Sequence, residues 1–292
     1  MQGEAGAGLV DNKETRLRDL LGEIGGGVLA FSGGVDSTFL AKVAAEVLGK
    51  RLLAVTGLSP TLPPGDEEEA AGLAAGLGLN HRFIRTEEAS RPEFVANTPE
   101  RCYFCKDDLY RRLGEVAAAE GLPWVLDGTQ ADDAADHRPG RVAARERGVR
   151  SPLAEIGFTK AEIRVASRRL GLPTWCKEAS PCLSSRFPYG TAIRMEDLER
   201  VGQAEAFLRG LGFSPVRVRH HGEVARLEVG VADLAKVLAQ REEIVGRLRS
   251  LGYLHVTLDL AGYRQGSLNE GLVVTDRAAG GAGTRALPEG GR

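Results

Sequence analysis

Apolar residues in the first part of the chain follow two alternating patterns. Continuous apolar runs at 28–31 and 52–58 predict strands that are buried on both faces of a parallel sheet. From Val35 to Leu48, apolar residues recur every three or four positions, which predicts a helix with one buried face. The alternation extends to strands predicted at 81–86 and 124–129 and to helices predicted at 13–24 and 106–119. This order of elements predicts a doubly wound parallel sheet, an α/β fold.

The pattern changes after about residue 180. Helices are predicted there at 195–211 and 231–251, and strands at 216–219, 225–229 and 254–258. These elements predict a second, smaller α+β domain, in agreement with a chain too long for one hydrophobic core. We therefore expect a first domain at 13–180, a second at 181–274, and flexible tails at 1–12 and 275–292.

Composition narrows the classes of protein that fit. The chain has 292 residues, of which 42% are hydrophobic and 27% charged, as in soluble globular proteins. No apolar run approaches the ~20 residues of a membrane-spanning helix, and the first residues do not resemble a signal peptide. We therefore expect a cytoplasmic protein without a membrane partner. A net charge of −2 also argues against a nucleic-acid partner.

Residues 32–37, Ser-Gly-Gly-Val-Asp-Ser, join the first strand to the helix that follows. Small residues let the backbone approach an anion closely, and the positive end of the helix dipole points at the same place. The spacing is that of neither a Walker loop nor a dinucleotide-binding loop. The alternative is an ordinary glycine turn in which Asp36 and Ser37 cap the helix.

Other polar residues follow neighbouring predicted strands. Ligands of parallel sheets bind at the carboxyl ends of the strands, so Thr56, Gly128 and Thr129 are expected beside the 32–37 turn. The stretch 127–133 is rich in Asp, and its alternative interpretation is a polar turn whose aspartates bond within the turn.

Three further stretches complete a resemblance to a known family. They are PERCYFCK at 99–106, PCLSSRFPYG at 181–190 and VRVRHHGEVARLEV at 216–229. Together with SGGVDS at 32–37, they resemble the LarE family of the PP-loop ATP pyrophosphatases. These are ATP-dependent sulfurtransferases in the biosynthesis of the nickel-pincer nucleotide cofactor. The resemblance implies that ATP adenylates a carboxylate of pyridinium-3,5-biscarboxylic acid mononucleotide, and that sulfur then displaces AMP to leave a thiocarboxylate.

The resemblance also implies roles for individual residues. Two residues would be catalytic. Asp36 would bind magnesium or the nucleotide, and Cys182 would donate the sulfur. ATP would be bound by Ser32, Gly33, Gly34, Asp36, Ser37, Thr56, Gly128 and Thr129. The nucleotide substrate would be bound by Ser185, Arg186, Glu205, Arg217, Arg219 and Glu228. The alternative for Arg217 and Arg219 is the solvent face of an alternating strand.

The four cysteines are too few and too far apart for a disulfide framework. In some members of the family, three cysteines hold a [4Fe-4S] cluster that carries an extra sulfide, and the matching residues are Cys102, Cys105 and Cys182. In others, a single cysteine gives up its own sulfur. A zinc site that includes Cys176, and buried thiols with no chemistry, are further alternatives. Cys176 fits neither family scheme and is interpreted as a spectator. No histidine is assigned as a metal ligand.

Two other enzyme classes share the 32–37 turn. A tRNA thiouridine synthetase would need an RNA-binding module, and an amidating enzyme of the NAD-synthetase or GMP-synthetase type would need no cysteine. A non-enzymatic scaffold is the third alternative. The family resemblance further implies a homo-oligomer, with a hexamer as one arrangement, although no sequence feature identifies an interface.

Overall fold

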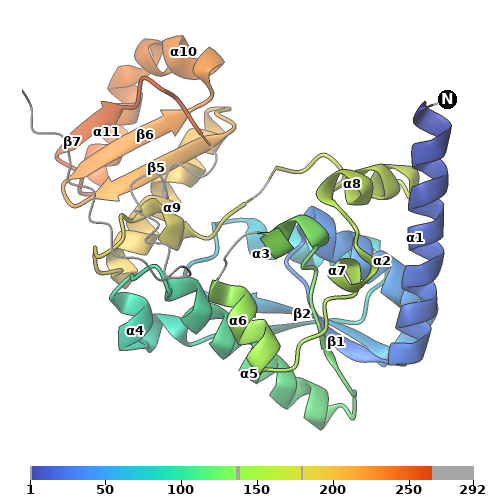
Figure 1. Cartoon of the computed structure of the whole chain (residues 1–292). Coiled ribbons are helices and arrows are strands. Elements are labelled where there is room, and N and C mark those ends of the chain that lie inside the picture. Colours follow the sequence, from blue (N-terminus) through green and yellow to red (C-terminus); the bar gives the residue numbers. More distant parts are fainter. Residues whose placement is uncertain (1, 136–138, 179, 265–292) are drawn as a thin grey trace, which may run out of the picture.

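Four short parallel strands form the central sheet, in the order β3-β2-β1-β4 (Figure 1). The computed structural model describes residues 2–135, 139–178 and 180–264. The strands are β1 (Gly27–Ala30), β2 (Leu52–Leu58), β3 (His81–Arg85) and β4 (Val125–Leu126). Val28 pairs with Leu53 on one side and with Val125 on the other, so β1 is central.

Helices cover both faces of this sheet. The helices are α1 (Gln2–Ile24), α2 (Val35–Leu48), α3 (Asp66–Gly76), α4 (Pro92–Val95), α5 (Arg101–Ala119), α6 (Pro139–Glu146), α7 (Pro152–Ile156) and α8 (Lys160–Arg169). Leu29 packs against buried residues of α1, α2, α3 and α8. Val28, its neighbour, points to the other face and packs with Leu113 of α5. The predicted doubly wound α/β fold is confirmed.

A second, smaller sheet has the order β5-β6-β7. Its elements are α9 (Met195–Gly210), β5 (Val216–His221), β6 (Val224–Val229), α10 (Leu234–Ala239), α11 (Arg241–Ser250) and β7 (His255–Leu258). β5 and β6 are antiparallel, and β7 runs parallel to β6. Helices α9 and α11 supply the core on one face through Leu208 and Leu248. This arrangement confirms the predicted α+β unit.

A separate apolar cluster joins the two sheets. Phe94 of α4 packs with Phe187 and with Val201 of α9, and Cys105 lies at the edge of the cluster. The backbone N–H of Leu183 also donates to the carbonyl of Thr61, at 2.7 Å. The segment that leads to the second sheet is therefore held against the carboxyl ends of the first sheet.

Three predicted boundaries change in the structure. Helix α1 begins at Gln2 rather than Lys13, so the expected loose tail at 1–12 is wrong for residues 2–12: Val10 is buried, and Asp11 forms an ion pair with Arg169. Helix α5 begins at Arg101 and includes the Cys102–Cys105 stretch. The helix predicted at 231–251 divides at Gln240, which lets Val237 and Ile244 reach the same core. The expected tail at 275–292 lies outside the described residues.

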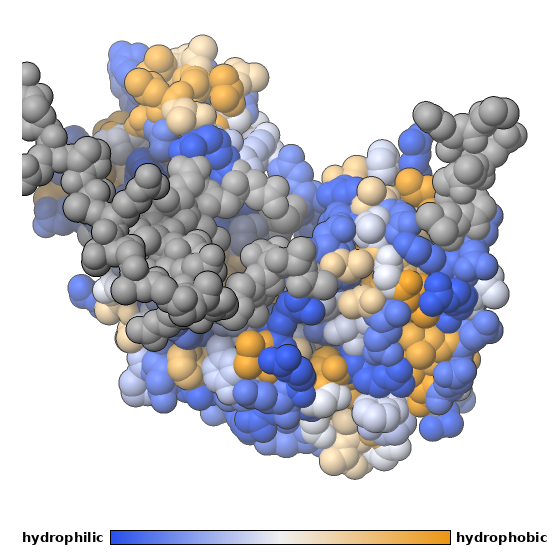
Figure 2. Space-filling view, in the orientation of Figure 1, coloured by the Kyte–Doolittle hydropathy of each residue, from blue (hydrophilic) through white to orange (hydrophobic). Residues whose placement is uncertain are grey.

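Two surface features bear on partners. In the described part of the chain, no helix is long and apolar enough to cross a bilayer. Apolar side chains gather over the outer surface of α10 (Figure 2), where Val231 and Leu238 are 68% and 59% exposed.

Candidate active site

The Ser32–Ser37 turn has the geometry of an anion-binding loop. Gly33 has a φ of +66°, and a Cβ there would lie 3.3 Å from Cδ1 of Leu73, so glycine is required. The hydroxyls of Ser32 and Ser37 lie 3.1 Å apart. The N-cap residue of helix α2 is Gly34, which has no side chain to cap the helix, and the Ser37 hydroxyl donates to the carbonyl of Gly34. The amides in the first turn of the helix therefore carry no side-chain cap and can bind an anion.

Asp36 has two carboxylate oxygens in different situations. Oδ2 accepts a hydrogen bond from Nζ of Lys160 at 2.6 Å. Oδ1 is buried and has no hydrogen-bond partner among the described residues. A buried, unpartnered carboxylate oxygen beside an anion-binding turn fits a ligand of magnesium, which prefers oxygen donors.

Two lysines beside the turn were missed by the sequence interpretation. Lys160 is the first residue of α8, and Lys177 donates to the carbonyl of Gly33 at 3.1 Å and pairs with Glu69 at 2.7 Å. A sequence signal exists for Lys160, because a cation at the positive end of a helix is unfavourable unless a partner compensates. No such signal marks Lys177, whose contact with Gly33 spans 144 residues of sequence.

The end of β4 packs directly on the start of α2. A Cβ on Gly128 would lie 3.0 Å from the backbone nitrogen of Ser37, so only glycine allows this approach. Asp127, buried beside it, accepts hydrogen bonds from the side chains of Thr129, Tyr110 and Ser151 at 2.7–2.8 Å. Gly128 and Thr129 are thus brought to the Ser32–Ser37 turn, with Asp127 as the hub that holds them.

Thr56 also lies at the sheet end, but its hydroxyl is engaged within the protein. It donates to the carbonyl of Phe31 at 2.7 Å and lies 2.8 Å from Nε2 of His81. In this arrangement Thr56 supports the strand that leads into the turn.

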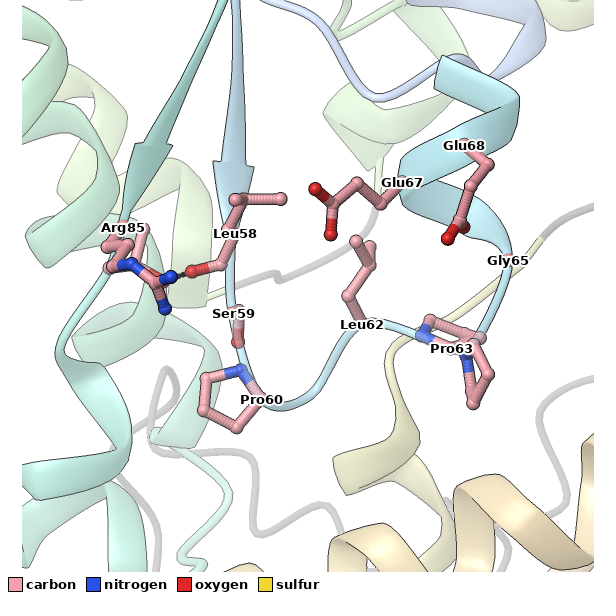
Figure 3. A pocket seen from close by; sticks show the side chains of 11 residues that line it. Leu58, Ser59, Pro60, Leu62, Pro63, Gly65, Glu67, Glu68 and Arg85 are labelled. Carbon is pink, nitrogen blue, oxygen red and sulfur yellow. Dashed lines mark hydrogen bonds between the residues drawn. The ribbon is translucent and has the colours of Figure 1, made fainter. Parts of the chain in front are cut away.

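A cavity of about 510 Å³ lies at the ends of β2 and β3 and the start of α3 (Figure 3). Leu58 and Arg85 come from the ends of β2 and β3, and Glu67 comes from the first turn of α3. Its lining does not include the Ser32–Ser37 turn, so the cavity extends the sheet-end site toward β3.

Three thiols approach one another near the apolar cluster that joins the two sheets. Cys102 and Cys105 lie in the first turn of α5, and Cys182 precedes the turn at Leu183–Arg186; all are free. Burial raises the pKa of the Cys105 thiol strongly, and the charges of Glu88 and Cys182 add to this effect. Desolvation raises the pKa of Cys102 too, followed by the charge of Cys182. Cys182 is therefore within electrostatic range of both helix thiols.

These thiols do not form an assembled metal centre. Over the described ranges, no group of three or more His, Cys, Asp or Glu side chains is placed to hold a metal ion. Cys176 is exposed and free. The donor chemistry of Cys102, Cys105 and Cys182 fits an iron-sulfur cluster, which prefers thiolates, but the three would have to draw together.

The predicted substrate residues of the second sheet form two buried ion pairs. Arg186 donates to both oxygens of Glu205 at 2.7 and 2.8 Å, and these side chains are 1% and 0% exposed. Burial acts to raise the pKa of Glu205, but the hydrogen bond and charge of Arg186 outweigh it and hold the pKa below its usual range. Arg219 binds Glu228 in the same way, at 3.0 and 2.7 Å. Both glutamates therefore position arginines.

Arg217 and Arg219 are each 7% exposed, so their interpretation as a solvent face is wrong. The alternation along β5 is real, because Val218 between them faces the apolar core. The opposite face is covered: Arg219 donates to the carbonyl of Ser185 at 2.7 Å, and Arg217 lies over the ring of Tyr263 at 5.1 Å. Burial, together with the charge of Arg186, lowers the pKa of the Arg217 guanidinium.

One segment links the two groups of residues. Lys177 contacts the Ser32–Ser37 turn, and Ser180 donates to Asp66 at 3.1 Å. Ser185, further along the segment, donates its hydroxyl to the carbonyl of Cys182 at 2.9 Å and accepts a hydrogen bond from Arg186 at 2.8 Å. The thiol group and the arginines thus lie on a path that starts at the Ser32–Ser37 turn.

Comparisons with known proteins agree with this geometry. The family model described as NAD synthase matches residues 10–113, which contain the Ser32–Ser37 turn. An uncharacterised protein of Synechocystis sp. is 46% identical over 89% of this chain and 98% of its own length. An uncharacterised protein of Methanocaldococcus jannaschii is 30% identical over 81% of this chain and 90% of its own length.

A named relative carries the assignment further. The pyridinium-3,5-bisthiocarboxylic acid mononucleotide synthase of Lactiplantibacillus plantarum is 41% identical over 84% of this chain and 89% of its own length. The chain belongs to the LarE family of pyridinium-3,5-bisthiocarboxylic acid mononucleotide synthases.

Proposed function

We propose that this protein is an ATP-dependent sulfurtransferase that converts a carboxylate of pyridinium-3,5-biscarboxylic acid mononucleotide into a thiocarboxylate, for the nickel-pincer nucleotide cofactor. The observation that carries the proposal is the segment that touches the anion-binding turn through Lys177 and then presents the free thiol of Cys182. One site can thereby both activate a carboxylate and deliver sulfur to it.

The first step is adenylation. A substrate carboxylate oxygen attacks the α-phosphate of ATP, and pyrophosphate leaves with the electron pair of the broken P–O bond. The amides of Gly33 and Gly34 and the hydroxyls of Ser32 and Ser37 bind pyrophosphate, and Asp36 holds magnesium through its unpartnered oxygen. Magnesium, when bound, supplies positive charge to the phosphates. The nucleotide site also includes residues at neighbouring strand ends: Thr56, Gly128 and Thr129.

The second step is sulfur transfer. A carboxylate resists a sulfur nucleophile, whereas its mixed anhydride with AMP has a good leaving group. An anionic sulfur forms the C–S bond, and the C–O bond to AMP breaks with its electrons on the phosphate oxygen. If the sulfur is that of Cys182, loss of the proton on its Cα and cleavage of the Cβ–S bond leave a thiocarboxylate and a dehydroalanine.

Arg217 and Arg219 clamp the phosphate of the nucleotide substrate, and Arg186 completes the substrate pocket. Planar guanidinium groups suit phosphate, and the three arginines lie together beside the Cys182 turn. Glu205 and Glu228 hold two of them in fixed orientations, and Ser185 joins this group to Cys182. A substrate anchored there would direct a ring carboxylate toward the nucleotide.

Cys102, Cys105 and Cys182 are proposed to hold a [4Fe-4S] cluster that would supply the sulfur as sulfide, so that the enzyme would turn over repeatedly when sulfide from solution replaces the one transferred. Three thiolates leave one iron free for an extra sulfide. Iron and acid-labile sulfide in protein purified without oxygen test this arrangement. About four irons per chain, with an unchanged protein mass after turnover, support it. Absence of iron, with loss of the elements of hydrogen sulfide at Cys182, assigns the sacrificial route instead.

The Cys182→Ala variant tests the function itself. Pyrophosphate release with ATP and the dicarboxylate nucleotide should persist, while formation of thiocarboxylate should stop. Hydroxylamine in the assay traps the adenylate as a hydroxamate and so measures the first step alone. The matched control is Cys176→Ala, which removes an exposed thiol outside the proposed ligand set. Normal sulfur transfer by Cys182→Ala would refute the role of Cys182, and absence of pyrophosphate release by the unaltered protein would refute the function.

A cytoplasmic homo-oligomer is proposed as the working form. The exposed apolar side chains around α10, including Val231 and Leu238, are the surface that supports self-association. Light scattering of the purified protein, compared with that of a Leu238→Lys variant, tests whether this surface forms the interface.

A further inference from the structure

Arg101 is a buried cation at the start of α5, directly before Cys102. It is 3% exposed, and its guanidinium donates to the carbonyl of Ser184 at 2.9 Å and to the side chain of Asn97. It also lies over the ring of Tyr189, at 5.6 Å from the centroid. Its contacts thus connect α5 to the turn that follows Cys182.

Asn97 strengthens the same connection from the other side. Its side-chain nitrogen donates to the carbonyls of Pro188 and Thr191 at 2.8 and 2.9 Å. Asn97 is fully buried and has a φ of +53°, a left-handed conformation that few residues other than glycine adopt. Strained positions of this kind persist where surrounding contacts fix them, and they concentrate at functional sites.

Arg101 has no carboxylate partner in the part of the chain that the structure describes. The other deeply buried arginines of the site differ, because Arg186 and Arg219 each bind a glutamate through two hydrogen bonds. A buried charge without a counter-charge is costly, since neutral carbonyl and amide groups replace only part of its hydration. The arrangement therefore lacks an anion.

The position of the Arg101 guanidinium indicates where such an anion would bind. Arg101 directly precedes Cys102 in α5, and its guanidinium donates to the carbonyl of Ser184, two residues after Cys182. Positive potential thus lies on the side of Cys102 and the Cys182 turn.

We propose that Arg101 is a positioning residue for sulfur transfer, which holds the Cys182 turn against α5 and supplies the counter-charge for the anionic sulfur that attacks the adenylate. The inference rests on the proposed function and adds a residue to its second step. Asn97 and Ser184 fix the guanidinium beside the turn that follows Cys182. Arg101 takes no part in binding ATP, because none of its contacts reaches the Ser32–Ser37 turn.

Two substitutions separate charge from hydrogen bonding. Arg101→Gln retains a hydrogen-bond donor for Ser184 and removes the charge, whereas Arg101→Lys retains the charge and loses the planar fork. In single-turnover assays with ATP and the dicarboxylate nucleotide, we expect Arg101→Gln to slow thiocarboxylate formation roughly 10²-fold. Arg101→Lys should be at least about ten times faster than Arg101→Gln. Hydroxamate formation in the presence of hydroxylamine should remain within about twofold of the unaltered protein for both.

A second measurement needs no turnover. The rates at which iodoacetate and iodoacetamide alkylate Cys102 in protein freed of iron are compared at one pH, with mass spectrometry to identify the labelled cysteine. Both reagents require the same thiolate, so the ratio of the rates reports the local potential and not the fraction ionised. We expect the ratio to fall several-fold in Arg101→Gln and to be maintained in Arg101→Lys.

Arg91→Gln is the matched control. Arg91 also precedes a helix near these cysteines, but it is partly exposed, pairs with Asp107, and lies over Phe104. It should change neither the assays nor the alkylation ratio. Equal loss of hydroxamate and thiocarboxylate in Arg101→Gln would overturn the proposal, because it would indicate a general structural role. An unchanged alkylation ratio, or equal activity of the Gln and Lys variants, would also overturn it. If the unaltered protein forms no hydroxamate, the proposed function fails, while the alkylation ratio still tests the charge.

Discussion

Around the Ser32–Ser37 turn, two lysines reach the loop from a distant segment, and their ion pairs with Asp36 and Glu69 are partly exposed. Along β5, by contrast, two arginines and the glutamates that hold the site together are almost completely buried. The first region therefore binds charge with backbone groups and two partly exposed cations. The second region binds charge with side chains that the fold has already fixed.

This difference predicts opposite consequences of mutation. A partly exposed ion pair contributes little to stability, since water and salt screen it. Removing one partner of a buried pair lowers the free energy of unfolding strongly, because the other charge is left buried without a counter-charge. Substitutions at the turn should therefore lower the reaction rate with little change in the free energy of unfolding. Substitutions at the arginine site should mainly lower the free energy of unfolding.

Asp36→Asn is expected to have the largest effect. The change preserves shape but removes the negative charge of the unpartnered oxygen, so pyrophosphate release should fall roughly 10³-fold or more. The free energy of unfolding should change by less than about 1 kcal/mol, because the ion pair with Lys160 is partly exposed. Pyrophosphate release and thermal unfolding of the same preparation measure both quantities.

Lys13→Met is the control for that measurement. Lys13 pairs with Glu162 on α8, as Lys160 on the same helix pairs with Asp36, but it lies away from the turn. It should leave pyrophosphate release unchanged. A large loss of stability in Asp36→Asn would contradict the contrast between the two regions.

Glu205→Gln should act in the opposite way. The carboxylate of Glu205 accepts hydrogen bonds from Arg186, Arg209 and the backbone N–H of Val218. Loss of its charge leaves Arg186 buried and uncompensated, which should lower the free energy of unfolding by about 3–5 kcal/mol. Denaturant unfolding measures this loss.

The double variant Arg186→Met/Glu205→Leu sharpens the comparison. Replacing both members of a buried pair with apolar side chains is often nearly neutral, so stability should return toward that of the unaltered protein. Substrate binding should be lost, because Arg186 is absent. If the double variant were as unstable as Glu205→Gln, the ion pair would not be the cause of the instability.

The two regions also differ in how well the sequence predicts them. The Ser32–Ser37 turn is a contiguous stretch whose strand and helix are encoded by local apolar patterns, so its fold was predicted correctly. The capping box at Thr159 and Glu162 is another local pattern, formed by residues three positions apart, and it is present. Local patterns do not specify which distant residue reaches the turn, and so Lys160 and Lys177 were missed.

The burial of β5 is a second feature that the sequence pattern does not predict. The Val-Arg alternation predicts one apolar and one polar face, and both faces exist. The pattern does not reveal that the 182–186 turn and Tyr263 cover the polar face. Arg101 and Asn97 were missed for the same reason, because their partners lie 83 to 94 residues away in the sequence.

The smallest expected effect concerns the pH dependence of the second region. His220 on β5 is buried against Phe187, and its Nδ1 lies 3.2 Å from the hydroxyl of Tyr253. Burial lowers its pKa below 6.5, and Arg200, His221 and Arg194 act in the same direction, while Asp197 opposes them.

Because the unfolded chain then binds a proton more readily, stability should decline as pH falls from about 6.5 through the lowered pKa of His220. His220→Gln should weaken this decline, measured by denaturant unfolding between about pH 7.5 and 5.5. The exposed His255, changed to Gln, should leave it intact. An identical decline in His220→Gln would mean that the buried histidine is not its source, and that fixed ion pairs alone distinguish the second region from the first.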